Sequence, residues 1–369
     1  MGCFDWIVLV WQVVTEMLIT FCLISWESIR WLVPRRQKSI EGQVVLVTGA
    51  GHGIGKNIAL HMGKLQATVV CWDKDETSNS STAQEINHLG GRAVAYTVDV
   101  SEREQVMEAA RQTEKVVGHV AMLINNVGVY PVKQILDWSH ADLSELVQVN
   151  FFSHFWTLQA FLPGMISRNN GHVVAISSAA AIAPVASEVP YSASKAAVTA
   201  LMDGMQQEAY FDSKCKIKFT TVHPYYTATR NDLPVKFEIR FDRLSPGYVS
   251  AEIVKGILQE REMVSVPRFM LFWIYFMRCL PQKARHRWRE VFYTRVHPEP
   301  ESTKLLVEKE GTTFVGAALD ANASVEGSRG YVNEANTIEE LEDCRGDHNS
   351  IQGSLDDSQS QSQIVTVRL

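Results

Sequence analysis

Between residues 43 and 300, short apolar runs rich in β-branched residues alternate with longer stretches of helical length. The runs lie at 43–49, 67–73, 92–100, 120–126, 172–178 and 216–224. Nearly continuous apolar runs are typical of strands buried on both faces of a parallel sheet. Because a helix-length stretch separates each run from the next, the pattern predicts an α/β fold, a doubly wound Rossmann-type parallel sheet in a single catalytic domain. The run "MVSVP" at 263–267 predicts a last strand.

The first apolar segment precedes this pattern. From Trp6 to Trp26 the only charged residue is Glu16, and basic residues follow the segment from Arg30 to Lys38. About 20 apolar residues match the hydrocarbon layer of a bilayer, and a basic flank favours the cytosolic side. Residues 1–38 are therefore predicted to be a membrane anchor with the catalytic domain facing the cytosol. A carboxylate in mid-membrane is costly, so a helix lying in the interface and a hairpin are alternatives to a span.

The C-terminal part of the pattern is aromatic and then basic. Residues 268–280 read "RFMLFWIYFMRCL", and "PQKARHRWREVFYTR" follows at 281–295. This segment, about 268–295, either rests on an anionic membrane surface or packs on the core as a C-terminal helix. We include it in a catalytic domain at 39–300. Residues 301–369 are rich in Ser, Asn, Gly and Glu, which predicts a disordered tail.

Charge and cysteine content narrow the partners. The tail holds thirteen acidic and five basic residues, whereas the whole chain has a net charge of −6, so the remainder is nearly neutral. That balance gives no indication of a nucleic-acid partner. The six cysteines form no CxxC pair, and no metal site is predicted.

A glycine-rich turn follows the first predicted strand directly. The stretch "TGAGHGIG" at 48–55 contains Gly49, Gly53, Ile54 and Gly55. Glycines at a strand–helix turn let the backbone approach a pyrophosphate, whose charge the helix N-terminus favours. Asp73 ends the second predicted strand. A carboxylate there binds the ribose hydroxyls and repels a 2′-phosphate, which predicts NAD as the preferred cofactor and NADP as the alternative.

A tyrosine and a lysine lie four residues apart in "YSASK" at 191–195. On a helix, Tyr191 and Lys195 share one face. A free phenol has a pKa of about 10, too high for a base at neutral pH, and a nearby cation lowers it. We therefore expect Lys195 to lower the pKa of Tyr191, which then exchanges a proton with a substrate oxygen.

Taken together, these motifs resemble the classical short-chain dehydrogenases/reductases over about residues 40–265. The glycine motif, the "NNVG" at 125–128 and the serine 13 residues before Tyr191 carry the resemblance. The resemblance implies a catalytic tetrad of Asn150, Ser178, Tyr191 and Lys195, with Ser177 as the neighbour at the wrong spacing. It also implies cofactor contacts from Asp99, Asn126, Gly128, Tyr191, Lys195 and Thr229, with Thr227 as a rival to Thr229.

Downstream, "HPYYTATR" places Tyr225 where the family usually has a glycine. This variant and the N-terminal anchor resemble the membrane-attached retinol and 17β-hydroxysteroid dehydrogenases. The resemblance implies a lipophilic alcohol or carbonyl substrate contacted by Ser178, Tyr191 and Tyr225 and covered by a lid within 225–250. It also implies an endoplasmic reticulum membrane or lipid droplet location, and a homodimer is a further expectation. The competing hypothesis is a membrane or lipid-droplet scaffold, or a nucleotide sensor, that keeps the fold and has little catalysis.

Overall fold

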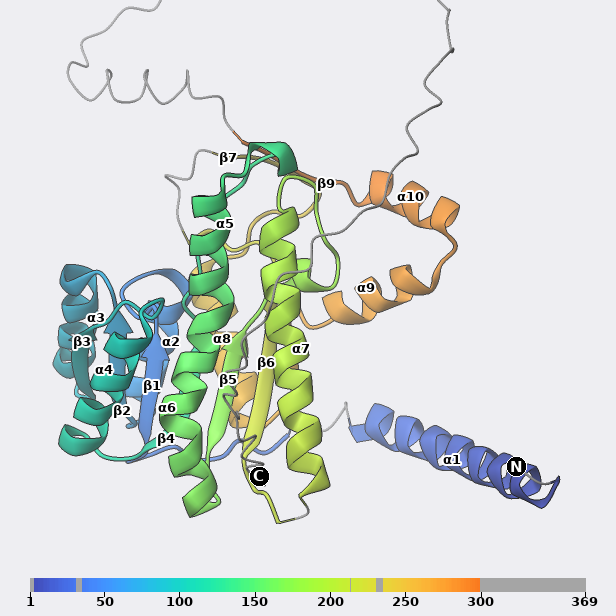
Figure 1. The fold of residues 1–369 in the computed structure, drawn as a ribbon, viewed down its shortest axis with the longest axis horizontal. Helices are drawn as coiled ribbons and strands as arrows, with labels where there is room; N and C mark the ends of the chain where they lie inside the picture. The colour runs from blue at the N-terminus through green and yellow to red at the C-terminus, as the bar shows by residue number, and fades with distance from the viewer. Residues whose placement is uncertain (1–2, 31–34, 213, 230–234, 299–369) are drawn as a thin grey trace, which may run out of the picture. The chain divides into compact units, whose positions relative to one another are not determined.

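The computed structural model describes residues 3–30, 35–212, 214–229 and 235–298 (Figure 1). Its main sheet has seven strands, all parallel, in the order β3-β2-β1-β4-β5-β6-β8. The strands are β1 Val44–Thr48, β2 Thr68–Asp73, β3 Arg92–Thr97, β4 Val120–Asn125, β5 His172–Ile176, β6 Lys218–Pro224 and β8 Met263–Val266. The predicted doubly wound sheet is confirmed. The strand order reverses between β1 and β4, which is where such sheets bind ligands, at the carboxyl ends of their strands.

Helices cover both faces of the sheet (Figure 1). One apolar core contains residues of α2 (Gly53–Lys64), α3 (Glu76–His88) and α8 (Pro246–Leu258). The other contains residues of α4 (Arg103–Val116), α6 (Ser153–Arg168) and α7 (Val189–Phe211). In β1, Val45 and Val47 belong to the first core and Leu46 to the second, as the alternation of side chains along a strand requires. The sheet is therefore buried on both faces, which explains its continuous apolar strands.

Shorter elements lie between the main ones. They are η1 Ile135–Asp137, α5 His140–Val147, the π-helical turn η2 Gln148–Phe152 and η3 Ala179–Ala181. Sequence reasoning did not predict a second, two-stranded antiparallel sheet of β7 (Val235–Ile239) and β9 (Thr294–Pro298). It joins the predicted lid region to the end of the domain.

The aromatic segment forms α9 (Met270–Cys279), and the basic segment forms α10 (Gln282–Val291). Leu271 is buried, and the Arg278 guanidinium donates a hydrogen bond to the carbonyl oxygen of Ile182 at 2.8 Å. Phe272 is 76% exposed. One side of α9 thus packs on the domain, and another presents aromatic side chains to the surroundings.

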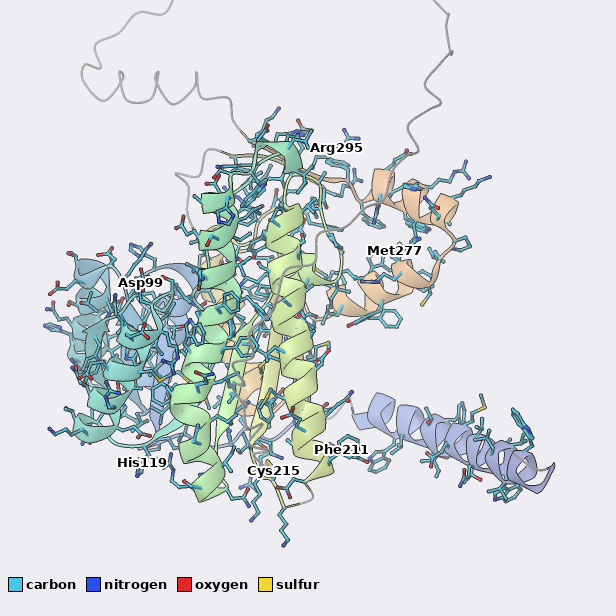
Figure 2. All side chains as sticks on the ribbon, in the orientation of Figure 1. Asp99, His119, Phe211, Cys215, Met277 and Arg295 are labelled. Atoms are coloured by element: carbon cyan, nitrogen blue, oxygen red, sulfur yellow. The ribbon has the colours of Figure 1, made fainter. Side chains whose placement is uncertain are left out.

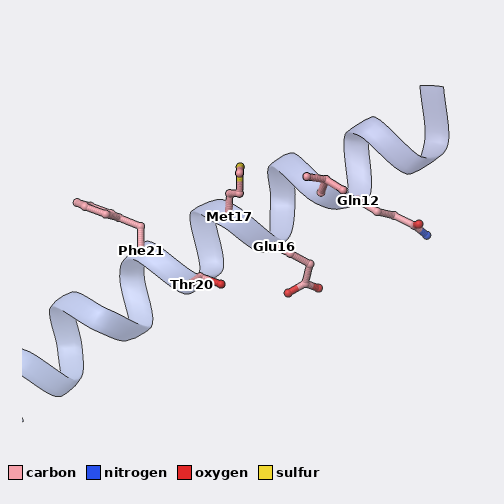
Figure 3. Close-up of a pocket in the computed structure, with 6 residues that line it drawn as sticks. Gln12, Glu16, Met17, Thr20 and Phe21 are labelled. Atoms are coloured by element: carbon pink, nitrogen blue, oxygen red, sulfur yellow. The ribbon is translucent and has the colours of Figure 1, made fainter. Parts of the chain in front are cut away.

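The N-terminal segment forms α1 (Cys3–Arg30). Gln12, Glu16 and Thr20, four residues apart, project to one side of this helix, and Met17 and Phe21 project to the other (Figure 3). Among the described residues, no helix, α1 included, combines the length and the apolar character that crossing a bilayer requires. The predicted tail at 301–369 lies outside the described residues.

Candidate active site

The glycine turn between β1 and α2 has a backbone that other residues would strain. Gly49 and Gly53 have φ values of +67° and +57°, in the left-handed region. A Cβ atom on Gly55 would lie 2.0 Å from the carbonyl oxygen of Gly49. Ile54, between the last two glycines, packs against the apolar core. The four predicted residues of the motif therefore form a close-packed turn anchored to the sheet.

The start of α2 suits an anion. Its N-cap residue, His52, makes no side-chain capping hydrogen bond, and the first turn holds no acidic residue. The N–H groups of a helix N-terminus are unpaired within the helix and carry a partial positive charge, so this end fits the pyrophosphate of a dinucleotide. Thr229 lies against the turn, since a Cβ on Gly53 would be 3.0 Å from it. The rival Thr227 instead donates its hydroxyl hydrogen to the carbonyl oxygen of Tyr225 at 2.9 Å.

Asp73, at the end of β2, and Asn126, just after β4, brace the same turn from the two sides of β1. One Asp73 oxygen accepts a hydrogen bond from the Gly51 N–H at 2.8 Å. The Asn126 amide donates to the carbonyl oxygens of Thr48 and Gly49, at 2.9 and 3.3 Å. Because a carboxylate oxygen can accept more than one hydrogen bond, Asp73 can still accept one from a ribose hydroxyl.

Asp99 follows β3 at the edge of the sheet (Figure 2). Its carboxylate accepts hydrogen bonds from the N–H and the hydroxyl of Ser101, at 2.9 and 2.6 Å. These bonds fix the carboxylate, and its second oxygen is left to accept from a ligand such as an adenine amino group.

Asn150, Lys195 and Gly128 meet behind the turn. Asn150 lies in η2, where its side chain accepts from the Val129 N–H at 2.8 Å and donates to the Val129 carbonyl oxygen at 3.0 Å. A Cβ on Gly128 would lie 3.2 Å from Lys195 Nζ and 3.3 Å from Asn150 Oδ1. Only glycine at position 128 lets Lys195 and Asn150 come this close to the backbone. The structure thus brings together three residues that are far apart in sequence.

Two neighbouring serines after β5 have different surroundings. The Ser177 hydroxyl is buried and donates to the backbone carbonyl oxygen of Lys195 at 2.8 Å. The Ser178 side chain is hydrogen-bonded to Tyr191 and also accepts from the Ala180 N–H at 3.1 Å. Ser178 is therefore the serine that faces the tyrosine, as the spacing predicts.

The pKa of Tyr191 departs from the sequence expectation. It is raised to about 12, chiefly by burial and also by the Glu188 carboxylate, and the Ser178 hydrogen bond acts in the opposite direction. Lys195 Nζ lies 6.0 Å from the centre of the Tyr191 ring and donates to the carbonyl oxygen of Ile176 at 3.0 Å. Burial lowers the pKa of Lys195 itself to about 8. The expected lowering by Lys195 is not seen in the protein alone, because Lys195 is not among the causes of the shift and desolvation of the phenol dominates it.

Tyr225, the third predicted substrate residue, belongs to a pair of aromatic rings with Tyr226. Its ring packs edge-on against Tyr226 at 5.0 Å, and its hydroxyl donates to the carbonyl oxygen of Phe241 at 3.3 Å. Sequence reasoning missed Glu188 and Tyr130, which contact Tyr226 and Tyr191 respectively. The one available signal was an acidic residue in the otherwise uncharged stretch just before "YSASK".

Comparisons with known proteins agree with this geometry. The model of the short chain dehydrogenase family matches residues 43–238. The chain is 35% identical to human epidermal retinol dehydrogenase 2 over 260 residues, 69% of this chain and 83% of that protein. It is 33% identical to human 17-beta-hydroxysteroid dehydrogenase 13, over 73% of this chain and 89% of that protein.

Among solved structures, a metagenomic short-chain oxidoreductase in complex with NADP is 28% identical. It superimposes with a TM-score of 0.53, covering 62% of this chain and 96% of that one. The glycine turn and the anion-binding helix end fit such a dinucleotide. The chain therefore belongs to the short-chain dehydrogenase/reductase family and is an alcohol dehydrogenase/reductase that uses a nicotinamide dinucleotide.

Proposed function

We propose that the protein interconverts a lipophilic alcohol and its carbonyl compound, with Tyr191 as the general acid/base. The observation that carries this proposal is that the Ser178 side chain lies within hydrogen-bonding reach of Tyr191 at the carboxyl end of β5. Two hydroxyl groups held together can both bind one substrate oxygen. Lys195 and Asn150 approach Gly128 closely, and Lys195 is proposed to hold the cofactor ribose there.

The residues divide the chemistry between them. Ser178 and Tyr191 hold the substrate oxygen, and Tyr191 accepts its proton in oxidation and returns it in reduction. The nicotinamide dinucleotide, when bound, accepts or supplies the hydride. Lys195 is the positive charge that stabilises the phenolate as it forms, and Asn150 holds the Val129 backbone beside it. Thr229 lies over the glycine turn and closes the cofactor site there.

The proposed cofactor is NAD rather than NADP. Asp73 projects toward the glycine turn, where its oxygen binds the Gly51 N–H. A carboxylate at this position accepts from ribose hydroxyls and repels a 2′-phosphate. Asp99 is proposed to bind the adenine ring, and Asn126, Gly128 and Ile54 to shape the rest of the cofactor site.

The proposed substrate is a retinoid, a hydroxysteroid or a similar lipid. The relatives' names include retinol and 17-beta-hydroxysteroid dehydrogenases. Aromatic rings of Tyr225, Tyr226 and Phe237 pack in one row beside the site, with centroid distances of 5.0 and 5.5 Å. Such rings supply an apolar surface for a lipid.

A membrane or lipid-droplet surface is the proposed location, with the catalytic domain on the cytosolic side. Phe269, Phe272 and Phe276 of the α9 region are 64%, 76% and 45% exposed, and four basic residues follow in α10: Lys283, Arg285, Arg287 and Arg289. Apolar and basic side chains together bind anionic interfaces. Flotation with vesicles tests this: binding is expected to rise with phosphatidylserine and to fall at high salt. The homodimer stays a prediction.

One comparison of variants tests the activity. Membranes containing the wild type, Tyr191→Phe or Tyr210→Phe are assayed with NAD and NADP against retinol, estradiol and 1-hexadecanol. Tyr210, in the same helix, is 82% exposed and is the matched control. We expect Tyr191→Phe to lose at least about a thousandfold in kcat/KM while still binding the cofactor, and Tyr210→Phe to match the wild type. Equal turnover by all three would refute the assignment, whereas cofactor binding without turnover would favour the scaffold or sensor.

A further inference from the structure

A buried carboxylate lies just ahead of the helix that carries Tyr191. Glu188 has no exposed surface, and its backbone carbonyl oxygen accepts the first hydrogen bond of α7, from the Ser192 N–H at 2.8 Å. A fully buried carboxylate is rare because losing its hydration is costly. The Glu188 side chain has no role in the reaction described above, so its retention calls for another explanation.

Two tyrosines donate to the same oxygen of this carboxylate. The Tyr226 hydroxyl donates to Glu188 Oε1 at 2.7 Å, and the Tyr130 hydroxyl donates to the same atom. Tyr130 follows β4, Glu188 follows β5 and Tyr226 follows β6. Glu188 therefore joins three segments at the carboxyl ends of three adjacent strands, the edge at which the site lies.

These tyrosines also contact the proposed catalytic residue and the wall beside it. The Tyr130 ring meets the Tyr191 ring edge-on, with centroids 4.8 Å apart and planes at 82°. The Tyr226 ring packs against Tyr225 and Phe237. Because both hydroxyl hydrogens are donated to Glu188, Tyr130 and Tyr226 have no donor left for a substrate and offer it mainly ring carbon.

We propose that Glu188 is the positioning residue of this site, fixing Tyr130 against Tyr191 and Tyr226 in the substrate wall so that the wall is apolar. The proposal rests on the dehydrogenase function above and deepens it by giving a reason for a lipophilic substrate. Glu188 acts through the tyrosines, and it touches neither the cofactor nor the reacting oxygen in this role.

The second oxygen of Glu188 supports a functional explanation over a purely structural one. Oε2 is buried and has no hydrogen-bond partner among the described residues. A buried acceptor without a partner lowers stability, so packing alone does not explain a carboxylate at this position.

The charge of Glu188 also acts on Tyr191. Burial is the main cause that raises the pKa of Tyr191, and the Glu188 carboxylate raises it as well. The Ser178 hydrogen bond acts in the opposite direction. The other groups facing this phenol are Lys195 from α7 and Tyr130 and Tyr226 from the loops. His223 of β6 lies behind Ser178, with Nδ1 3.1 Å from the Ser178 carbonyl oxygen.

Three variants of the full-length protein separate charge from position. Glu188→Gln keeps a hydrogen-bond acceptor for the tyrosines and removes the charge. Glu188→Leu removes both, and Glu208→Gln, at an exposed position of the same helix, is the matched control. The readouts are pH profiles of kcat/KM with NAD and the most active of retinol, estradiol and 1-hexadecanol, together with the cofactor Kd.

We expect Glu188→Gln to move the acidic limb of the profile about one pH unit lower, because the phenolate no longer faces a like charge. Glu188→Leu is expected to lower kcat/KM at least about tenfold with cofactor Kd within twofold, because the tyrosines lose their anchor. An unchanged profile in Glu188→Gln together with unchanged kcat/KM in Glu188→Leu would overturn the proposal.

A second readout needs no turnover. Ultraviolet titration of tyrosinate is carried out in two backgrounds, the wild type and Glu188→Gln, each with Tyr191 and with Tyr191→Phe. The difference within each background isolates the ionisation of Tyr191. Glu188→Gln is expected to lower that ionisation pH, and an equal value in both backgrounds would refute the coupling. If the wild type turns over none of the alcohols but this shift is present, the proposed substrate class fails while the role of Glu188 stands.

Discussion

The Nζ atom of Lys195 donates a hydrogen bond to the carbonyl oxygen of Ile176, 3.0 Å away, at the carboxyl end of β5. The bond ties the second turn of α7 to the strand that leads into Ser178. Lys195 is only 3% exposed, and it forms no ion pair with a carboxylate within the described residues. A buried cation held by a carbonyl alone is costly to the fold, and this cost makes the first prediction possible.

Replacing Lys195 by Met is expected to stabilise the protein and inactivate it. The pKa of Lys195 is lowered to about 8 by burial, against 10.5 unfolded. When the pKa of a basic group is lower in the folded protein than in the unfolded chain, the group destabilises the fold. This cost is complete at a pH below the folded pKa, and it disappears as the pH rises to the unfolded pKa. Lys195→Met should therefore gain up to about 3 kcal/mol in the free energy of unfolding at pH 7. The gain should vanish near pH 10.5 in denaturant titrations, and a loss of stability at pH 7 would contradict this account.

A second prediction compares two glycines in helices. Gly55→Ala places a Cβ against the Gly49 carbonyl oxygen, whereas a Cβ at Gly204 in α7 meets nothing within 4 Å. Gly55→Ala is expected to cost about 3 kcal/mol or more and to abolish cofactor binding, because backbone cannot yield as a side chain can. Gly204→Ala should stabilise by about 0.5–1 kcal/mol and leave cofactor binding unchanged. Thermal unfolding with and without NAD measures both effects, and equal behaviour of the two variants would contradict the close packing of the turn.

The sheet could be predicted because its strands are apolar on both faces, and each of the six runs from 43–49 to 216–224 contains a strand of the structure. The seventh, at 263–267, contains β8. The strands β7 and β9 were missed because Val235–Ile239 and Thr294–Pro298 mix charged and apolar residues and pair only over a long separation in sequence. Local pattern carries no information about such a partner.

At the site, sequence spacing identified Ser178 over Ser177, but it could not supply the electrostatics. The distance of Lys195 from the Tyr191 ring and the burial of Glu188 depend on tertiary packing. Burial decides one more sequence motif: Asn79-Ser80-Ser81 matches the acceptor pattern for N-glycosylation. The Asn79 side chain is 1% exposed and donates to the carbonyl oxygens of Cys71 and Tyr96, so its glycosylation would not report on which side of a membrane the domain lies.

A third prediction concerns cofactor choice. Asp73→Ser is expected to weaken NAD binding about tenfold or more and to raise the ratio of NADP to NAD affinity, since the ribose hydroxyls lose an acceptor and a 2′-phosphate loses a repelling charge. Both cofactors should lose some affinity because the Gly51 N–H also loses its acceptor. Glu76→Gln, three residues away and exposed, controls for net charge. Fluorescence titration gives the Kd values, and an unchanged ratio would assign the preference to other residues.

The last prediction uses a buried histidine in α6. Both ring nitrogens of His154 are buried without hydrogen-bond partners among the described residues, and burial, with a smaller effect of Lys195, lowers its pKa to about 3. The unfolded chain takes up this proton near pH 6.5, so the contribution of His154 to stability is fully present above pH 6.5 and is lost as pH falls toward 3. His154→Leu should remove that loss, raising the free energy of unfolding by about 4 kcal/mol at pH 3 relative to its effect at pH 7.

The matched control is His119→Leu, because His119 is exposed and projects away from the fold (Figure 2). Its ring lies 3.7 Å from the Glu114 carboxylate, and an exposed pair of this kind contributes little. Urea titrations of the full-length protein between pH 3 and pH 7 measure the slope of stability with pH for each variant. We expect the slope to become shallower by up to one proton for His154→Leu and to stay unchanged for His119→Leu. Parallel curves for wild type and His154→Leu would mean that the pKa of His154 is the same in the folded and the unfolded protein, which the burial of its ring makes unfavourable.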